Sequence, residues 1–224
     1  MRYALLLLAA LAAAASGCSG SEPASATGPT ATPSLRRLTT AADSLAGARS
    51  GAERRALAVR LLRRSGVTPL ADMGRRREAN PRFTVGEASP VAGFVPGQYP
   101  PARDELVIVG TTLDGPHTAP LVEAMRVLAE RSRWAVVPER SVMVALWSGP
   151  DGARETLASG VWPRQNVRAV VAVGEAVAVP DSLESVVIPT VPAATADERL
   201  ALAQRVLDET IRLARRPTPA DTIP

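Results

Sequence analysis

The sequence predicts an α/β protein, a three-layer α/β/α sandwich built on a mostly parallel mixed sheet. Two observations support this fold class. Short runs of consecutive apolar residues recur along the chain, and parallel strands that are buried on both faces have this composition. Segments with apolar residues at helical spacing alternate with these runs, which is typical of a parallel sheet covered by helices.

The elements can be assigned in chain order. Apolar residues at helical spacing predict helices at about residues 35–45, 57–65, 121–130, 152–159 and 195–216. Apolar runs predict strands at residues 91–95, 105–110, 142–147, 167–173 and 186–188, and a short strand at 82–85. The rest of the segment 70–89 is expected to be irregular.

A few residues mark the ends and faces of these helices. Gly47 and Gly51 are expected to break the first helix, and Gly66 to close the second. In the third helix, three charged residues are expected to lie off the apolar face: Glu123, Arg126 and Glu130. Thr195 followed by Glu198 predicts a capping box at the start of the last helix.

The amino-terminal residues differ in character from the rest of the chain. Arg2 precedes a short apolar run from Tyr3 to Ala15, as in a secretory signal peptide. A membrane-spanning helix would need about 20 such residues. The run closes with Ala15-Ser16-Gly17-Cys18, which resembles a bacterial lipobox, although Ala15 stands where leucine is usual. We expect residues 1–17 to be a lipoprotein signal peptide and Cys18, the only cysteine, to carry the lipid. An ordinary cleaved signal peptide is the alternative.

The remaining chain divides into three parts. Residues 18–34 are rich in Ser, Ala and Thr, a composition that cannot bury a core and predicts a flexible tether. Residues 35–216 form the predicted α/β domain, and residues 217–224 a disordered tail. Together with a lipid on Cys18, this organisation places the domain outside the cytoplasm, anchored to a membrane of a bacterial cell envelope. That membrane is the outer one if the host has two.

Composition narrows the classes of function. Hydrophobic residues make up 46% of the chain, as in a globular protein, and aromatic residues only 3%. The net charge is +4, but 22 acidic residues are interspersed with the arginines, so we expect no nucleic acid partner. Clusters at residues 75–77 and 215–216 are interpreted as solvated charge, with anionic lipid headgroups as the alternative contact.

One stretch is more specific than periodicity alone. Residues 89–97, ending in Pro96-Gly97, lead through a loop to the Val-rich run 104–110. This order resembles the core entry of the zinc-dependent aminopeptidases, the co-catalytic di-zinc exopeptidases of metallopeptidase family twenty-eight. Residues 43–70, 122–130 and 142–149 are similar to the entry helices, the next helix and the next strand of that family. The resemblance covers roughly residues 35–175 and implies an aminopeptidase-like, truncated fold.

The resemblance also implies a site that can be checked position by position. A di-zinc site needs His and carboxylate ligands, a bridging carboxylate and a Glu that acts as general base. Thr112 stands where the family has its first ligand His, and Asp114 matches an Asp that orients a ligand. Pro150-Asp151 replaces the Glu pair of base and ligand, and His117 is the only histidine. We therefore expect no catalytic residue, no metal site and no zinc cofactor.

Three hypotheses about function follow. The first is a lipid-anchored, catalytically inactive relative of the zinc aminopeptidases with a binding or structural role at the cell envelope. The second is a metal-dependent peptidase with a rebuilt site, in which His117, Asp114, Asp151 and Glu175 hold one metal ion. The third is an unrelated α/β envelope lipoprotein that binds another protein. The expected partners are the membrane, through the lipid on Cys18, and an envelope protein.

Overall fold

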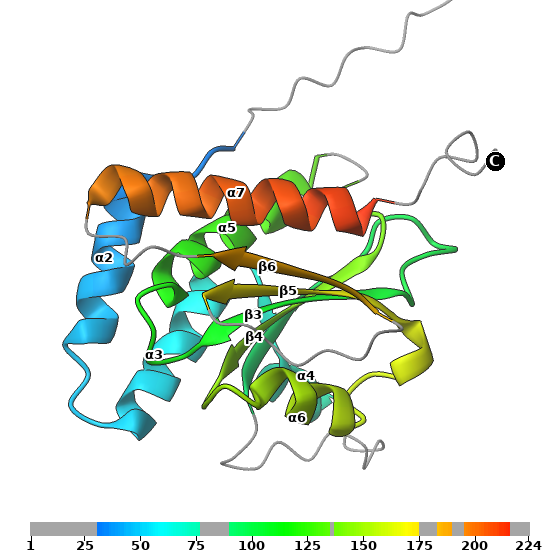
Figure 1. Cartoon of the computed structure of the whole chain (residues 1–224), viewed down its shortest axis with the longest axis horizontal. Helices are drawn as coiled ribbons and strands as arrows, with labels where there is room; N and C mark the ends of the chain where they lie inside the picture. The colour runs from blue at the N-terminus through cyan, green and yellow to red at the C-terminus, as the bar shows by residue number, and fades with distance from the viewer. Residues whose placement is uncertain (1–30, 77–89, 135–136, 175–182, 190–194, 216–224) are drawn as a thin grey trace, which may run out of the picture. The chain divides into compact units, whose positions relative to one another are not determined.

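A six-stranded mixed sheet forms the middle layer of the fold, with helices on both of its faces (Figure 1). The computed structural model describes residues 31–76, 90–134, 137–174, 183–189 and 195–215, which lie in one compact unit, Ala31–Pro224. The predicted signal peptide, Cys18, most of the predicted tether, the short strand at 82–85, Glu175 and the tail at 217–224 lie outside the described residues. The predicted three-layer α/β/α sandwich is confirmed.

The elements follow the predicted order with two additions, β1 and α4. The helices are α2 (Leu35–Ala46), α3 (Gly51–Arg64), α4 (Leu70–Arg76), α5 (Thr118–Arg131), α6 (Gly152–Ala158) and α7 (Ala196–Ala214). The strands are β1 (Thr68–Pro69), β2 (Val91–Val95), β3 (Leu106–Thr112), β4 (Ser141–Trp147), β5 (Val167–Gly174) and β6 (Glu184–Pro189). A short 3-10 helix, Arg164–Asn166, precedes β5.

The sheet is mostly parallel, as predicted. Its strand order is β1-β2-β4-β3-β5-β6. The strands β4, β3, β5 and β6 run parallel to one another, whereas β1 pairs antiparallel with β2, and β2 antiparallel with β4. The carboxyl ends of β3, β4 and β5 therefore lie at one end of the sheet, and their amino ends at the other.

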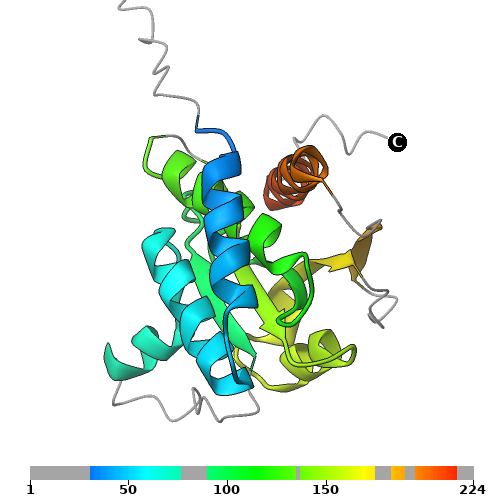
Figure 2. The same cartoon turned by 90° about the vertical axis from the view of Figure 1, so that its left-hand side faces the viewer.

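Successive side chains of each strand point to opposite faces of the sheet, so the domain has an apolar core on each face. Val107 and Val109 face a core that includes residues of α3, α5 and α7, whereas Leu106 and Ile108 face a second core shared with α4 and α6. The helix α2 packs on α5 and α7 through a smaller cluster around Leu38 (Figure 2). The face under the two seven-residue helices α4 and α6 has the thinner cover.

The helix ends show why these segments fold as they do. The side chain of Ser50 accepts the amide hydrogen of Glu53 at the start of α3. Gly66 has a φ of 76°, so it closes α3 as predicted. The capping box of Thr195 and Glu198 at the start of α7 is confirmed, with both hydrogen bonds present.

Two predictions about local structure are wrong. Residues 70–76 are not irregular but form α4, because Leu70 and Met73 lie one turn apart and pack against the sheet face that holds Phe94. Asp72 in this helix is bonded to Arg63 of α3, with an N–O distance of 2.7 Å. Gly51 does not lie in a break between helices but is the first residue of α3.

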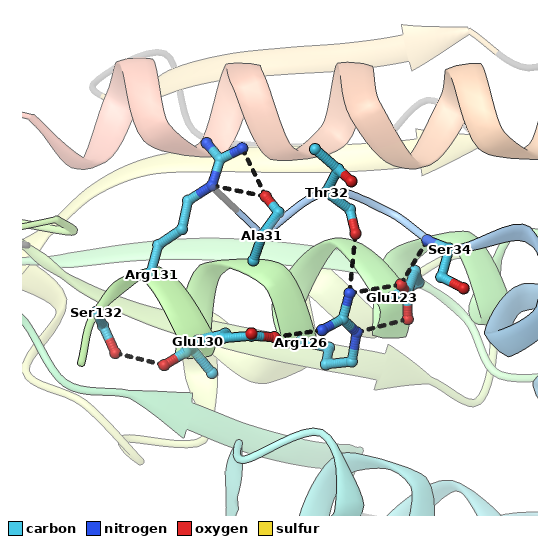
Figure 3. A network of polar contacts seen from close by, with 9 residues as sticks. Ala31, Thr32, Ser34, Glu123, Arg126, Glu130, Arg131 and Ser132 are labelled. Atoms are coloured by element: carbon cyan, nitrogen blue, oxygen red, sulfur yellow. Dashed lines mark hydrogen bonds and ion pairs between the residues drawn. The ribbon is translucent and has the colours of Figure 1, made fainter. Parts of the chain in front are cut away.

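The prediction for Glu123 is also wrong, because this residue is buried, with 4% of its surface exposed. Its carboxylate accepts the amide hydrogen of Ser34 at 2.8 Å and hydrogen bonds from Arg126 (Figure 3). Arg126 also donates to the carbonyl of Thr32, and Arg131 to that of Ala31. The last four residues of the predicted tether are therefore held against α5.

Candidate functional site

The segments that carry the sequence-predicted site positions meet at the carboxyl end of the sheet. Thr112 ends β3 directly opposite Trp147, the last residue of β4. The amide of Leu113 donates to the carbonyl of Trp147 over 2.7 Å, which ties the two strand ends together. In open α/β sheets ligands bind outside the carboxyl ends of the strands. This end of the sheet is therefore the first place to look for a site.

The two carboxylates at this end of the sheet, those of Asp114 and Asp151, are each paired with an arginine. Asp114 is exposed and bonded to Arg54 of α3. Asp151 precedes α6 and is exposed, and its carboxylate lies 2.9 Å from the guanidinium of Arg154. Pro150 is exposed beside it. The fold thus brings the loops of Asp114 and Asp151 to one end of the sheet, while each carboxylate is paired with an arginine of a different helix.

The other two positions singled out in the sequence, Thr112 and His117, are not exposed. Thr112 is half-buried, and its hydroxyl lies where a side chain on Gly115 would be. His117 is 8% exposed and lies at the N-cap of α5. In the described part of the chain, no three or more His, Cys, Asp and Glu side chains are grouped so that they could hold a metal ion. His117, Asp114 and Asp151 consequently do not form such a group.

The side chain of Trp147 fills the space between β3 and α6. A Cβ on Gly110 would lie within 2.7 Å of three atoms of the indole ring, and a Cβ on Gly152 would overlap the same side chain. The indole nitrogen donates to the hydroxyl of Thr156 over 3.1 Å. Glycine is therefore required at both positions for this tryptophan to pack.

A large groove lies at the opposite end of the sheet, beside the amino ends of β3, β4 and β5. This groove has a volume of about 1050 Å³. Its most prominent feature is an aromatic pair, in which Phe94 of β2 stacks on Trp162 with ring centroids 5.0 Å apart. Residues of α4, of α6 and of the segment between α6 and β5 complete the wall: Leu70, Met73, Leu157, Val161, Gln165 and Asn166.

Hydrogen bonds hold the residues that line the groove in place. The indole nitrogen of Trp162 donates to the carbonyl of Asp104 over 2.9 Å. The hydroxyl of Ser141 donates to the carbonyl of Arg103 and accepts the amide hydrogen of Gly97. A Cβ on Gly97 would lie 2.7 Å from the carbonyl carbon of Arg140, so only glycine allows this close approach. The Pro-Gly pair after β2 therefore shapes one wall of the groove.

The chemistry of the groove is that of a binding surface. Its floor is apolar and aromatic, and its rim carries Arg103, Asp104 and Arg164, all of them exposed. Sequence reasoning did not locate the groove. No local pattern reveals it, because Phe94 and Trp162 lie in segments far apart in the sequence.

In the part of the chain that the structure describes, every helix is too short or too polar to cross a membrane. Comparison with models of protein families gave no match, and a search among curated proteins gave none either.

Proposed function

We propose that this chain is a lipid-anchored protein of the cell envelope whose α/β domain acts by binding another protein, and not by metal-dependent hydrolysis. The groove with the stacked Phe94 and Trp162 carries the proposal. It has a volume of about 1050 Å³ and lies at the opposite end of the sheet from Thr112, Asp114 and Asp151.

The composition of the groove favours a protein segment as the bound partner. Its volume of about 1050 Å³ is at the upper end of small-molecule sites, which span about 300–1,000 Å³. Protein interfaces combine a buried aromatic and aliphatic centre with a polar rim, and tryptophan and arginine dominate their binding energy. Trp162 and Phe94 supply such a centre, and Arg103, Asp104 and Arg164 such a rim.

We also propose that the scaffold of this domain derives from that of the zinc aminopeptidases. In support, the strand, Pro-Gly turn and buried strand occur at residues 91–110 in the order that suggested the resemblance. Thr112 and Pro150 are not metal ligands of the family type, and Asp114 and Asp151 are bonded to Arg54 and Arg154.

A calorimetric titration with zinc tests the exclusion of metal chemistry. We expect no binding heat for the chain from Ser19 onward, which keeps every described helix and strand. Stoichiometric binding at micromolar zinc would contradict the proposal. His117, Asp114 and Asp151 would then be replaced first, and peptide substrates tried.

Photo-crosslinking in the native host tests binding at the groove. A photoreactive amino acid replaces Gln165, which is exposed on the groove wall, or Ala201, which is exposed on α7 far from it. We expect one discrete protein adduct from position 165 and none from position 201. Trp162→Ala should abolish the adduct, and Arg164→Glu, which leaves the core untouched, should weaken it. Equal adducts from both positions, or none from position 165, would contradict the proposal.

A further inference from the structure

A second cavity, with a volume of about 340 Å³, lies where α2, α3 and α5 meet. Four arginines from these three helices line it: Arg36 and Arg37 of α2, Arg64 of α3 and Arg126 of α5. Glu123 is the only carboxylate among the lining residues. The cavity therefore has a strong excess of positive charge on one side of the molecule.

Three of the four arginines are not paired with a carboxylate in the described part of the chain. Arg126 is the exception, because it is bonded to both Glu123 and Glu130, and Glu123 also accepts the amide hydrogen of Ser34. Hydrogen bonding to Glu123 raises the pKa of Arg126, against the effect of burial, so this guanidinium stays charged. Arg36, Arg37 and Arg64 form no ion pair with any described carboxylate, so their guanidinium groups can still donate to an anion.

Helix stability does not account for the two arginines of α2. Arg36 and Arg37 lie in the first turn, and this turn contains no acidic residue. The amino end of a helix carries partial positive charge, so cations there are unfavourable. A bound anion would compensate both arginines at once. Arg64, by contrast, lies in the last turn of α3, where a cation is favourable.

The cavity also lies where the amino-terminal segment reaches the domain. Arg126 on its wall donates to the carbonyl of Thr32, and Glu123 holds the amide of Ser34 (Figure 3). About 13 residues separate Cys18 from Ala31, and a chain of that length spans at most about 45 Å. If Cys18 carries a lipid, this side of the domain is tethered close to the membrane surface.

We propose that Arg36, Arg37 and Arg64 form a site for the phosphate groups of anionic membrane lipids, beside Arg126, which is held by Glu123 and Glu130. Guanidinium groups bind phosphate oxygens by paired hydrogen bonds, and basic clusters near a membrane are attracted to anionic headgroups. The site would hold the domain with α2 against the membrane and leave the groove of Phe94 and Trp162, on the other face of the sheet, open to a partner. The position of the tether enters this argument through the proposed lipid, but the site itself consists of described residues.

Co-sedimentation with vesicles tests the site without the lipid anchor, so its result is independent of the proposed lipidation and of the groove. The chain from Ser19 onward is mixed with phosphatidylcholine vesicles or with vesicles that also contain phosphatidylglycerol. Arg37→Gln/Arg64→Gln removes two charges from the cavity. Arg60→Gln/Arg205→Gln removes two charges from exposed positions outside it and serves as the matched control. Circular dichroism and a cooperative thermal transition verify that both variants fold.

We expect binding to the phosphatidylglycerol vesicles alone, weakened about tenfold or more in the cavity variant and less than about twofold in the control. Added salt should weaken the binding of the unmodified chain. Equal losses in both variants would show diffuse charge attraction and overturn the proposal. So would binding of inorganic phosphate in solution as tight as that of the vesicles, because the site would then serve a soluble phosphate compound. Absence of binding to the anionic vesicles would overturn it as well.

Discussion

Glu105 connects three segments at the amino end of the sheet. Its carboxylate accepts hydrogen bonds from Arg140 at 2.7 Å and from Arg168 at 2.9 Å. Arg140 also donates to the carbonyl of Leu213, near the end of α7. Burial favours the neutral form of Glu105, but the two arginines together outweigh this effect and lower its pKa below the usual value near 4.5. The stability of the fold should therefore depend on the ionisation of Glu105.

We predict that Glu105→Gln reduces the dependence of stability on acid pH. Because the pKa of Glu105 is lower in the folded chain than in the unfolded one, its contribution to stability is complete above about pH 4.5 and is lost as the pH falls through the folded value. The variant should be less stable than the unmodified chain near neutral pH, and the difference should shrink in acid. Urea unfolding across this range measures it, with the exposed Glu155→Gln as control. A difference independent of pH would contradict the assignment.

A second prediction concerns the fit of Trp147. Gly110→Ala should lower the free energy of unfolding by about 2 kcal/mol, because its Cβ would overlap the indole ring. Gly149→Ala, where nothing lies within 4 Å of the added Cβ, should change little. In the Gly110→Ala background, Trp147→Leu should cost less than in the unmodified chain, as a double-mutant cycle by chemical denaturation would show. Strictly additive effects would argue against the contact.

At the scale of elements, the boundaries with local signals agree with the sequence, and those fixed by tertiary contacts do not. Thr195, Glu198 and Gly66 have chemistry that acts within a few residues, so the carboxyl end of α3 and the amino end of α7 could be predicted. The helix α4 depends on packing of Leu70 and Met73 against a distant strand, which no local pattern reveals.

The same distinction applies to the candidate sites. Asp114 and Asp151 each follow a predicted strand closely, so their place at the carboxyl end of the sheet follows from the strand pattern. Neither the arginine partners of these two carboxylates nor the Phe94–Trp162 stack could be predicted. Each of these contacts depends on which helix or loop crosses the strand end, and that is a property of the assembled layers.

The capping box supports a prediction for α7. Thr195→Ala should lower the stability of the domain by about 1 kcal/mol, because it leaves the amide of Glu198 without its acceptor. Thr39→Ala, at an exposed position within α2, is the matched control and should have little effect. Thermal unfolding measures both. Combining Thr195→Ala with Glu198→Ala should cost less than the sum of the two, since both residues belong to one motif.

At the scale of the whole molecule, the polar contacts of α5 join the start of the domain to its core. Glu123 and Ser34 are 89 residues apart in sequence and directly hydrogen-bonded. Arg126 and Arg131 bind the carbonyls of Thr32 and Ala31. A pull on the amino-terminal segment would therefore act first on the contacts of Arg131 and Arg126 with Ala31 and Thr32, and then on the buried carboxylate of Glu123.

We predict that Glu123→Gln lowers the free energy of unfolding by about 2 kcal/mol, because Arg126 loses its buried anionic partner. The amide of Ser34 should also exchange faster with solvent. Glu130→Gln, which removes the half-exposed partner of the same arginine, should cost well under about 1 kcal/mol. Urea unfolding and hydrogen exchange measure the two effects. Unchanged exchange at Ser34 would show that other contacts hold the segment.

The two edges of the sheet have a further consequence for the chain. At one edge β1 has only two residues, and one of them is Pro69, which has no amide hydrogen to offer. At the other edge β6 begins with Glu184, exposed and bonded to Arg212, and ends with Pro189. Unprotected edge strands recruit strands of other molecules and start aggregation. Copies of the domain held close together would therefore offer one another few free sheet edges, and fibrils could not easily grow from these edges.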